Sequence, residues 1–255
     1  ALPRGLLLPG TTYFFRVAHI GSDGRISPFS AETPFATGEI GVRPVPFDLS
    51  PVLNRDVLAD PGDPENDEFD PGAGDRPLIA VEGFDGLRAD IAGARGLPGD
   101  RKVGAHELAD YRGPNSLQLS PEAREAVRIP GPPGRYLAVR FLLSGGWGNA
   151  RIPVLLEGSG GKRIEKHILS NNWTNSIPPA GDDNLRGGAV AVLKGLAMVR
   201  DGRLADRPLG ALFEVILETD PEEELRALVL EPRQEDFEGK LTRANIFAVT
   251  GMAAR

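Results

Sequence analysis

Carboxylates are dense between residues 56 and 70, in a stretch that is also rich in proline and glycine. Hard oxygen ligands at this density can wrap Ca²⁺, which takes about six to eight oxygens from carboxylates, amides and carbonyls. The spacing is not that of an EF-hand loop, because the required Gly and the final Glu do not line up. The alternative is a solvated acidic loop without a metal. The predicted ligands of a structural Ca²⁺ are Asp56, Asp60, Asp63, Asn66, Asp67 and Asp70.

Two tryptophans lie among residue types that could recognise a sugar. Trp147 is flanked by glycines, and Trp173 follows two asparagines. An exposed indole could lie against a pyranose ring, and neighbouring amides could bond to its hydroxyls. The alternative, which we favour, is that each Trp fills one end of a core, because Trp is strongly buried on average. The predicted ligand-binding residues are Trp147, Asn149, Asn171, Asn172 and Trp173.

No constellation of catalytic residues is recognisable. The three histidines, His19, His106 and His167, are far apart, and none forms a pair with the spacing of zinc ligands. There is no Gly-x-Ser-x-Gly elbow, and no pair of carboxylates carries a glycosidase motif. The absence of cysteine excludes disulfides and thiolate metal sites. We therefore expect a protein that is not an enzyme; a hydrolase using the acidic loop as a metal site is the least favoured alternative.

Charge and composition limit the classes of partner that the chain could bind. The formal net charge of −7 argues against nucleic acid, because phosphate binding needs a basic surface. No apolar run is long enough to predict a membrane span. The 32 glycines and 23 prolines favour many turns and short strands, and 40% hydrophobic residues suffice for a packed core.

The candidate metal-binding and sugar-binding residues must be positioned by β-strands. Two apolar runs, 136–143 and 152–156, flank a glycine-rich break and are predicted to be adjacent strands at the heart of a β-sandwich. Side chains alternate along a strand, so Leu137, Val139, Phe141 and Leu143 should share one face. A stiff turn is predicted at 130–134. Further strands are expected at 12–20, 45–49, 77–84, 116–119, 125–129, 163–169, 189–200, 212–218, 225–230 and 245–250, the pattern of an antiparallel sandwich or jelly roll.

The first part of the chain resembles the last third of a fibronectin type III domain. The resemblance is carried by Leu8-Pro9-Gly10-Thr11-x-Tyr13-x-Phe15-Arg16-Val17, by the turn Ser22-Asp23-Gly24, and by Ser27-Pro28-Phe29-Ser30. It implies a partial domain over 1–38, with Tyr13 in the tyrosine corner, and covers about 32 of the roughly 100 residues of such a sandwich. Either the chain has been cleaved or truncated, or a partner chain supplies the missing strands.

After a proline-containing linker at 39–46, residues 47–255 resemble a galactose-binding-like jelly-roll module of secreted bacterial proteins. The resemblance is carried by Val45-Pro46-Phe47-Asp48-Leu49-Ser50, by Gly134-Arg135-Tyr136, and by Asn245-Ile246-Phe247-Ala248-Val249-Thr250-Gly251. It implies an extracellular or cell-surface location, and it favours Ca²⁺ near the first strands. The expected function is a non-catalytic binding or accessory module that contacts carbohydrate or a neighbouring envelope protein. The alternative is a structural or assembly segment whose exposed strands pair with another subunit.

Overall fold

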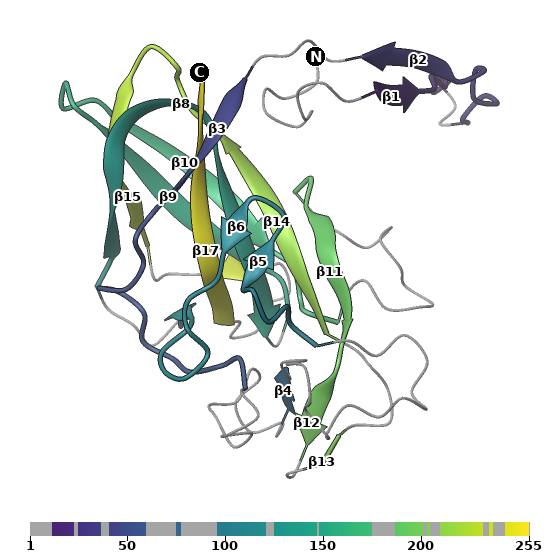
Figure 1. The fold of residues 1–255 in the computed structure, drawn as a ribbon. Coiled ribbons are helices and arrows are strands. Elements are labelled where there is room, and N and C mark those ends of the chain that lie inside the picture. The colour runs from purple at the N-terminus through teal and green to yellow at the C-terminus, as the bar shows by residue number, and fades with distance from the viewer. Residues whose placement is uncertain are drawn as a thin grey trace.

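The computed structural model describes residues 12–22, 25–36, 41–59, 75–77, 96–120, 125–146, 148–174, 187–200, 203–204, 210–231, 235–236 and 243–254. These residues form strands and turns, and every strand pair is antiparallel. Within these ranges there is no helix of the length and apolar character needed to cross a bilayer. The prediction of an all-β antiparallel sandwich is confirmed (Figure 1).

Two sheets form the sandwich, and the strand β8 (Val127–Gly146) belongs to both. The β14 sheet contains β11 (Val190–Leu196), β14 (Gly210–Glu218), the second half of β8 and β17 (Arg243–Ala254), with β3 (Val42–Pro46) and β7 (Leu117–Leu119) along the far edge of β17. The β9 sheet contains β10 (Arg163–Ser170), β9 (Ala150–Gly158), β15 (Glu224–Leu230) and the first half of β8, and β16 (Glu235–Asp236) also pairs with β9.

The change of sheet occurs inside β8, at the segment predicted to be a turn. Residues 127–135 pair with β15, and residues 136–146 pair with β14 and β17. The pairing with β15 skips from Pro130 to Gly134, so Pro132 and Pro133 lie in an irregularity where no ladder hydrogen bond is required of them. The predicted turn is therefore a corner within one continuous strand, and Figure 1 shows β8 curving over one end of the sandwich.

The two central apolar runs are strands, but the prediction that they are adjacent is wrong. One edge of β9 is occupied by β10 and the other by β15 and β16, while residues 136–146 of β8 lie between β14 and β17. The runs therefore lie in opposite sheets, and Phe141 and Val154 meet in the same buried cluster. The alternation of apolar residues identifies an inward face, but it does not identify the neighbouring strand.

Both faces of the β14 sheet are buried. Val139, Phe141 and Leu143 point into the core between the sheets, and Leu142 points to the outer face. There a second cluster, which includes Leu58, Leu108, Trp173, Leu196, Leu212 and Phe247, lies under residues 54–59 and 96–111. The covering segment includes a small hairpin, β5 (Lys102–Val103) and β6 (His106–Glu107). Burial on both faces explains why this part of β8 is almost continuously apolar.

The remaining strands form smaller sheets. β1 (Thr12–Phe15) and β2 (Thr33–Ala36) form a two-stranded sheet that lies to one side of the sandwich in Figure 1. β4 (Asp75–Pro77), β12 (Met198–Arg200) and β13 (Arg203–Leu204) form a three-stranded one. Residues 42–46, within the predicted linker, form strand β3, which pairs with β17. Its two prolines are accommodated because β3 pairs on one edge only.

Candidate functional site

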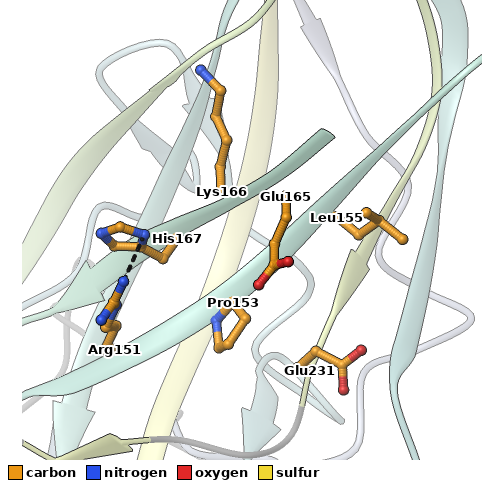
Figure 2. A pocket seen from close by; sticks show the side chains of 7 residues that line it. All are labelled: Arg151, Pro153, Leu155, Glu165, Lys166, His167 and Glu231. Carbon is orange, nitrogen blue, oxygen red and sulfur yellow. Dashed lines mark hydrogen bonds between the residues drawn. The ribbon is translucent and has the colours of Figure 1, made fainter. Parts of the chain in front are cut away.

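A shallow hollow of about 660 Å³ lies on the outer face of the β9 sheet (Figure 2). Along β9, Ile152 and Val154 point into the core, so Arg151, Pro153 and Leu155 point outward by the alternation of a strand. In the neighbouring β10, His167 lies opposite Pro153 and Glu165 lies opposite Leu155. The hollow, called below the β9–β10 hollow, is lined by Arg151, Pro153, Leu155, Glu165, His167 and Glu231.

The backbone fixes Glu231 on the opposite side of β9 from β10. It follows directly after β15, and its N–H donates to the carbonyl of Pro153 at 3.1 Å. Pro153 and Leu155 thus form an aliphatic floor with β10 on one side and the end of β15 on the other. Lys166 also lines the hollow, and Figure 2 shows its side chain extending away from the others. The lining side chains therefore come from three strands or strand ends of one rigid sheet.

Charge is distributed unevenly around this floor. Arg151 Nη2 lies 3.2 Å from His167 Nδ1. A guanidinium can only donate, so Nδ1 accepts, and the ring is neutral with its proton on Nε2. Figure 2 shows this pair on one side of Pro153 and Glu231 on the other. Within the described part of the chain, Glu165 and Glu231 have no cationic partner. The hollow thus has a cationic end, an apolar floor, and two carboxylates, Glu165 and Glu231, that have no cationic partner among the described residues.

A second polar cluster is buried on the outer face of the β14 sheet. His106 from β6 lies with both ring nitrogens 3.0 Å from an oxygen, Nε2 from Glu214 Oε2 and Nδ1 from Thr250 Oγ1. Arg140 Nη1 contacts Glu214 Oε1 at 3.2 Å from the neighbouring strand. Burial raises the pKa of the Glu214 carboxyl, but the hydrogen bond from His106 and the charge of Arg140 together outweigh it, so that this pKa lies below its usual value.

The order hydroxyl, imidazole, carboxylate in this cluster is that of a hydrolase triad. However, Thr250 is 0% exposed and His106 is almost as completely buried, so no substrate could reach the hydroxyl. The carboxylate is also neutralised by Arg140 rather than by an imidazolium formed during a reaction. The cluster therefore fastens the β5–β6 hairpin to the sheet and is not a reaction site.

The predicted sugar-binding residues gather at one end of the sandwich, apart from Trp147, which lies outside the described residues. Trp173 is 1% exposed and packs against Gly210. This burial agrees with the alternative in which the Trp fills one end of the core. Asn171 is buried, and its carbonyl accepts from the Gly145 N–H at 2.7 Å. Asn149 Oδ1 accepts from the Asn172 N–H at 2.8 Å. The three asparagines and Trp173 thus close the fold at this end, and the buried ring presents no face to solvent.

Of the predicted Ca²⁺ ligands, only Asp56 is described; Asp60, Asp63, Asn66, Asp67 and Asp70 lie outside the described residues. Asp56 Oδ1 accepts from Asn115 Nδ2 at 2.6 Å, and Asn115 Oδ1 accepts from the N–H groups of Val57 and Leu58. No group of three or more His, Asp or Glu that could hold a metal occurs among the described residues. The Ca²⁺ site stays a prediction.

The sequence gives little indication of the β9–β10 hollow. The only signal was the polar outward set of β9 and β10, notably Arg151, Glu165 and His167. Any strand with one face in water has the same alternation, so the pattern does not distinguish a binding face from a solvated one. Glu231 could not be placed beside Pro153 without knowing that β15 pairs with β9.

No family model matches the sequence, and a comparison with curated proteins also finds no match. The resemblances to a fibronectin type III domain and to a galactose-binding-like jelly roll stay predictions. The function of the chain has to be inferred from its own fold and from the β9–β10 hollow.

Proposed function

We propose that the chain is a non-catalytic binding module of a secreted or cell-surface bacterial protein, and that the β9–β10 hollow binds carbohydrate. The observation that carries the proposal is the combination of donors, acceptors and an apolar floor on one sheet face. A sugar presents hydroxyls that both donate and accept, together with apolar C–H faces. Arg151 and His167 Nε2 supply donors, Glu165 and Glu231 supply acceptors, and Pro153 and Leu155 supply the floor.

The size and the rigidity of the hollow support this function. A volume of about 660 Å³ falls within the range of roughly 300–1,000 Å³ that is usual for small-ligand sites. The floor residues belong to β9, which is paired on both edges, so the site is held by the sheet rather than by a loop. A preorganised site loses less conformational entropy when a ligand binds.

The test is a glycan array followed by titration calorimetry on the best ligand. Arg151→Ala and Glu231→Ala should each weaken binding by about tenfold, the loss expected for a charge-assisted hydrogen bond. The matched control is Arg163→Ala, because Arg163 lies on β10 but pairs with Glu157 outside the hollow. The proposal fails if no glycan binds, or if neither Arg151→Ala nor Glu231→Ala changes the affinity for the glycan.

A second candidate function, assembly with another subunit, is favoured by the β1–β2 sheet. Phe14 of β1 is 64% exposed, and Ile20, Ile26 and Phe29, which lie between the two strands in the sequence, are 72%, 65% and 61% exposed. An isolated pair of strands is marginally stable in water, and exposed apolar side chains of this size favour a partner surface. We propose that this sheet accepts strands from another chain, which would cover those side chains.

Native mass spectrometry on the full chain tests this second function. Assembly predicts oligomers that dissociate when Phe14 and Ile20 are replaced by Ser, while Val190→Ser, at an apolar residue of the sandwich that is 51% exposed, has no effect. A particle that stays monomeric up to high micromolar concentration would exclude self-assembly, and failure to capture a partner strand peptide would exclude strand addition.

A further inference from the structure

The β9–β10 hollow also indicates which class of saccharide it would take. Resting on the proposed function, we propose that its ligand is an acidic saccharide with a single carboxylate. The carboxylate would lie against Arg151 and His167, and the hydroxyls of an adjoining uncharged sugar would donate to Glu165 and Glu231. The contact between Arg151 and His167 carries this assignment.

At the cationic end, Arg151 and His167 both line the hollow and both carry N–H donors. One of the five guanidinium N–H donors of Arg151 is used on His167 Nδ1. The remaining donors of Arg151 can still bind a carboxylate with two hydrogen bonds. Because Nδ1 is already an acceptor, the imidazole proton is on Nε2, where it can be donated to a ligand. A neutral sugar hydroxyl would use these donors singly, whereas a carboxylate uses them together and gains the attraction of opposite charges.

At the other end, the carboxylates of Glu165 and Glu231 can only accept while ionised. Sugar hydroxyls are donors and satisfy them, but a second anionic group placed there would be repelled and would be desolvated without a partner. The charge pattern therefore favours one acidic ring followed by one neutral ring. It disfavours a ligand in which every ring carries a negative charge. The chain's net charge of −7 disfavours such a ligand as well, because like charges repel.

The spacing along β9 suits two linked rings. Arg151 and Leu155 are four residues apart in one strand, which is about 13 Å at the usual rise per residue. Pro153 lies midway, opposite His167, with Glu231 bonded to its carbonyl. One ring would rest near Arg151 and the next over Pro153 and Leu155, within reach of Glu165 opposite Leu155.

The experiment compares three disaccharides by calorimetry on the full chain: a uronic acid linked to a neutral hexose, the neutral disaccharide of the same rings, and the diuronic acid. The mixed disaccharide should bind about tenfold more tightly than either of the others. Arg151→Ala should remove this preference, because it should weaken binding of the mixed disaccharide about tenfold more than binding of the neutral one, whereas Arg163→Ala should change neither affinity. These side chains are exposed, so melting temperatures near that of the parent chain would show that the variants fold.

The outcomes separate this inference from the function on which it rests. If the neutral and mixed disaccharides bind equally, the ligand is not acidic, but carbohydrate binding at the hollow stands. If the diuronic acid binds most tightly, the assignment of Glu165 and Glu231 to hydroxyls is overturned. If none of the three binds and the glycan array is also silent, the proposed function itself fails.

Discussion

His106 Nε2 lies 3.0 Å from Glu214 Oε2, and this contact joins the β5–β6 hairpin to the middle of the β14 sheet. Both side chains are largely enclosed, and Arg140 neutralises the same carboxylate from the adjacent strand. A buried ion pair gives little net stability by itself, but removal of one partner leaves the other charge uncompensated. The contact therefore makes the hairpin sensitive to single substitutions.

Glu214→Gln should destabilise the fold by about 3 kcal/mol, because the buried Arg140 would lose its ion pair with this carboxylate and the buried His106 would lose a charged acceptor. The measurement is urea denaturation followed by circular dichroism. Glu218→Gln on the same strand is the matched control, since Glu218 has no ion pair within the described residues, and it should change stability by less than about 0.5 kcal/mol. Equal effects of the two substitutions would show that the buried pair is not a stabilising contact.

Acid should weaken the fold through the same carboxylate. The pKa of Glu214 is lowered in the folded protein from an ordinary value of 4.5. A group whose pKa is lower in the folded state stabilises above its unfolded-state pKa, and this stabilisation is lost as pH falls through the folded-state pKa. The melting temperature should therefore drop below about pH 4.5, more steeply in the parent chain than in Glu214→Gln. Parallel curves for the two proteins would assign the acid sensitivity to other groups.

The corner of β8 depends on a glycine in the neighbouring strand. A Cβ at Gly251 would lie less than 3.0 Å from the ring of Tyr136, which is buried and packs at a tilt against the ring of Phe47. Tyr136 is also held by its hydroxyl, which donates to the carbonyl of Pro132 at 2.6 Å. Gly251→Ala should thus cost about 1–3 kcal/mol by overpacking.

The control for this substitution is Gly113→Ala, because a Cβ at Gly113 meets nothing within 4 Å. It should leave stability unchanged or raise it slightly, since alanine restricts the unfolded chain. Thermal unfolding of both variants is the measurement. A loss of stability in Gly113→Ala as large as in Gly251→Ala would show that the Tyr136 ring is not the cause.

Trp173 should behave as a core residue. Trp173→Ala should lower the free energy of unfolding by about 3–5 kcal/mol, the usual cost of emptying a site of this size. Trp173→Phe should fold and keep its affinity for any glycan that binds at the β9–β10 hollow, because the ring is buried in a different cluster. Val192→Ala, on an exposed position of β11, is the control for stability. A specific loss of glycan affinity in Trp173→Phe would return this residue to the ligand site.

Calcium is tested by chelation. If the acidic loop binds Ca²⁺, excess EDTA should lower the melting temperature, because a metal bound to the folded state stabilises it by mass action. Returning Ca²⁺ should restore the original value, and Mg²⁺ at equal concentration should not, since it demands a tighter octahedral shell. An unchanged melting curve would leave the loop as a solvated acidic segment.

Sequence patterns predict many of the longer strands but not their partners. Turn residues and alternation identified strands such as β10 and β17, because both signals are local. The pairing of β8 with β14 and β17 rather than with β9 depends on which strands return to its edges from far along the chain. The five-residue proline and glycine run at 130–134 predicts a turn, but its composition fits a corner inside a strand equally well.

The candidate sites were harder to predict for a related reason. Trp173 and its asparagines have the composition of a sugar site, but composition does not show that the ring is enclosed by Leu196, Leu212 and the covering hairpin segment. His106 and Glu214 are 108 residues apart, and only the folded sheet makes them neighbours. The hollow itself consists of ordinary outward residues that become a site through the shape of the surface.

The passage of β8 through both sheets has a consequence for cooperativity. Residues 127–135 and 136–146 form one continuous strand that belongs to both sheets. One sheet therefore cannot unfold without disturbing the other where β8 passes between them. The ladder between β3 and β17 further ties an early segment of the sandwich to its last strand. Residues 42–254 are thus expected to melt in a single calorimetric transition, with no state in which one layer survives alone.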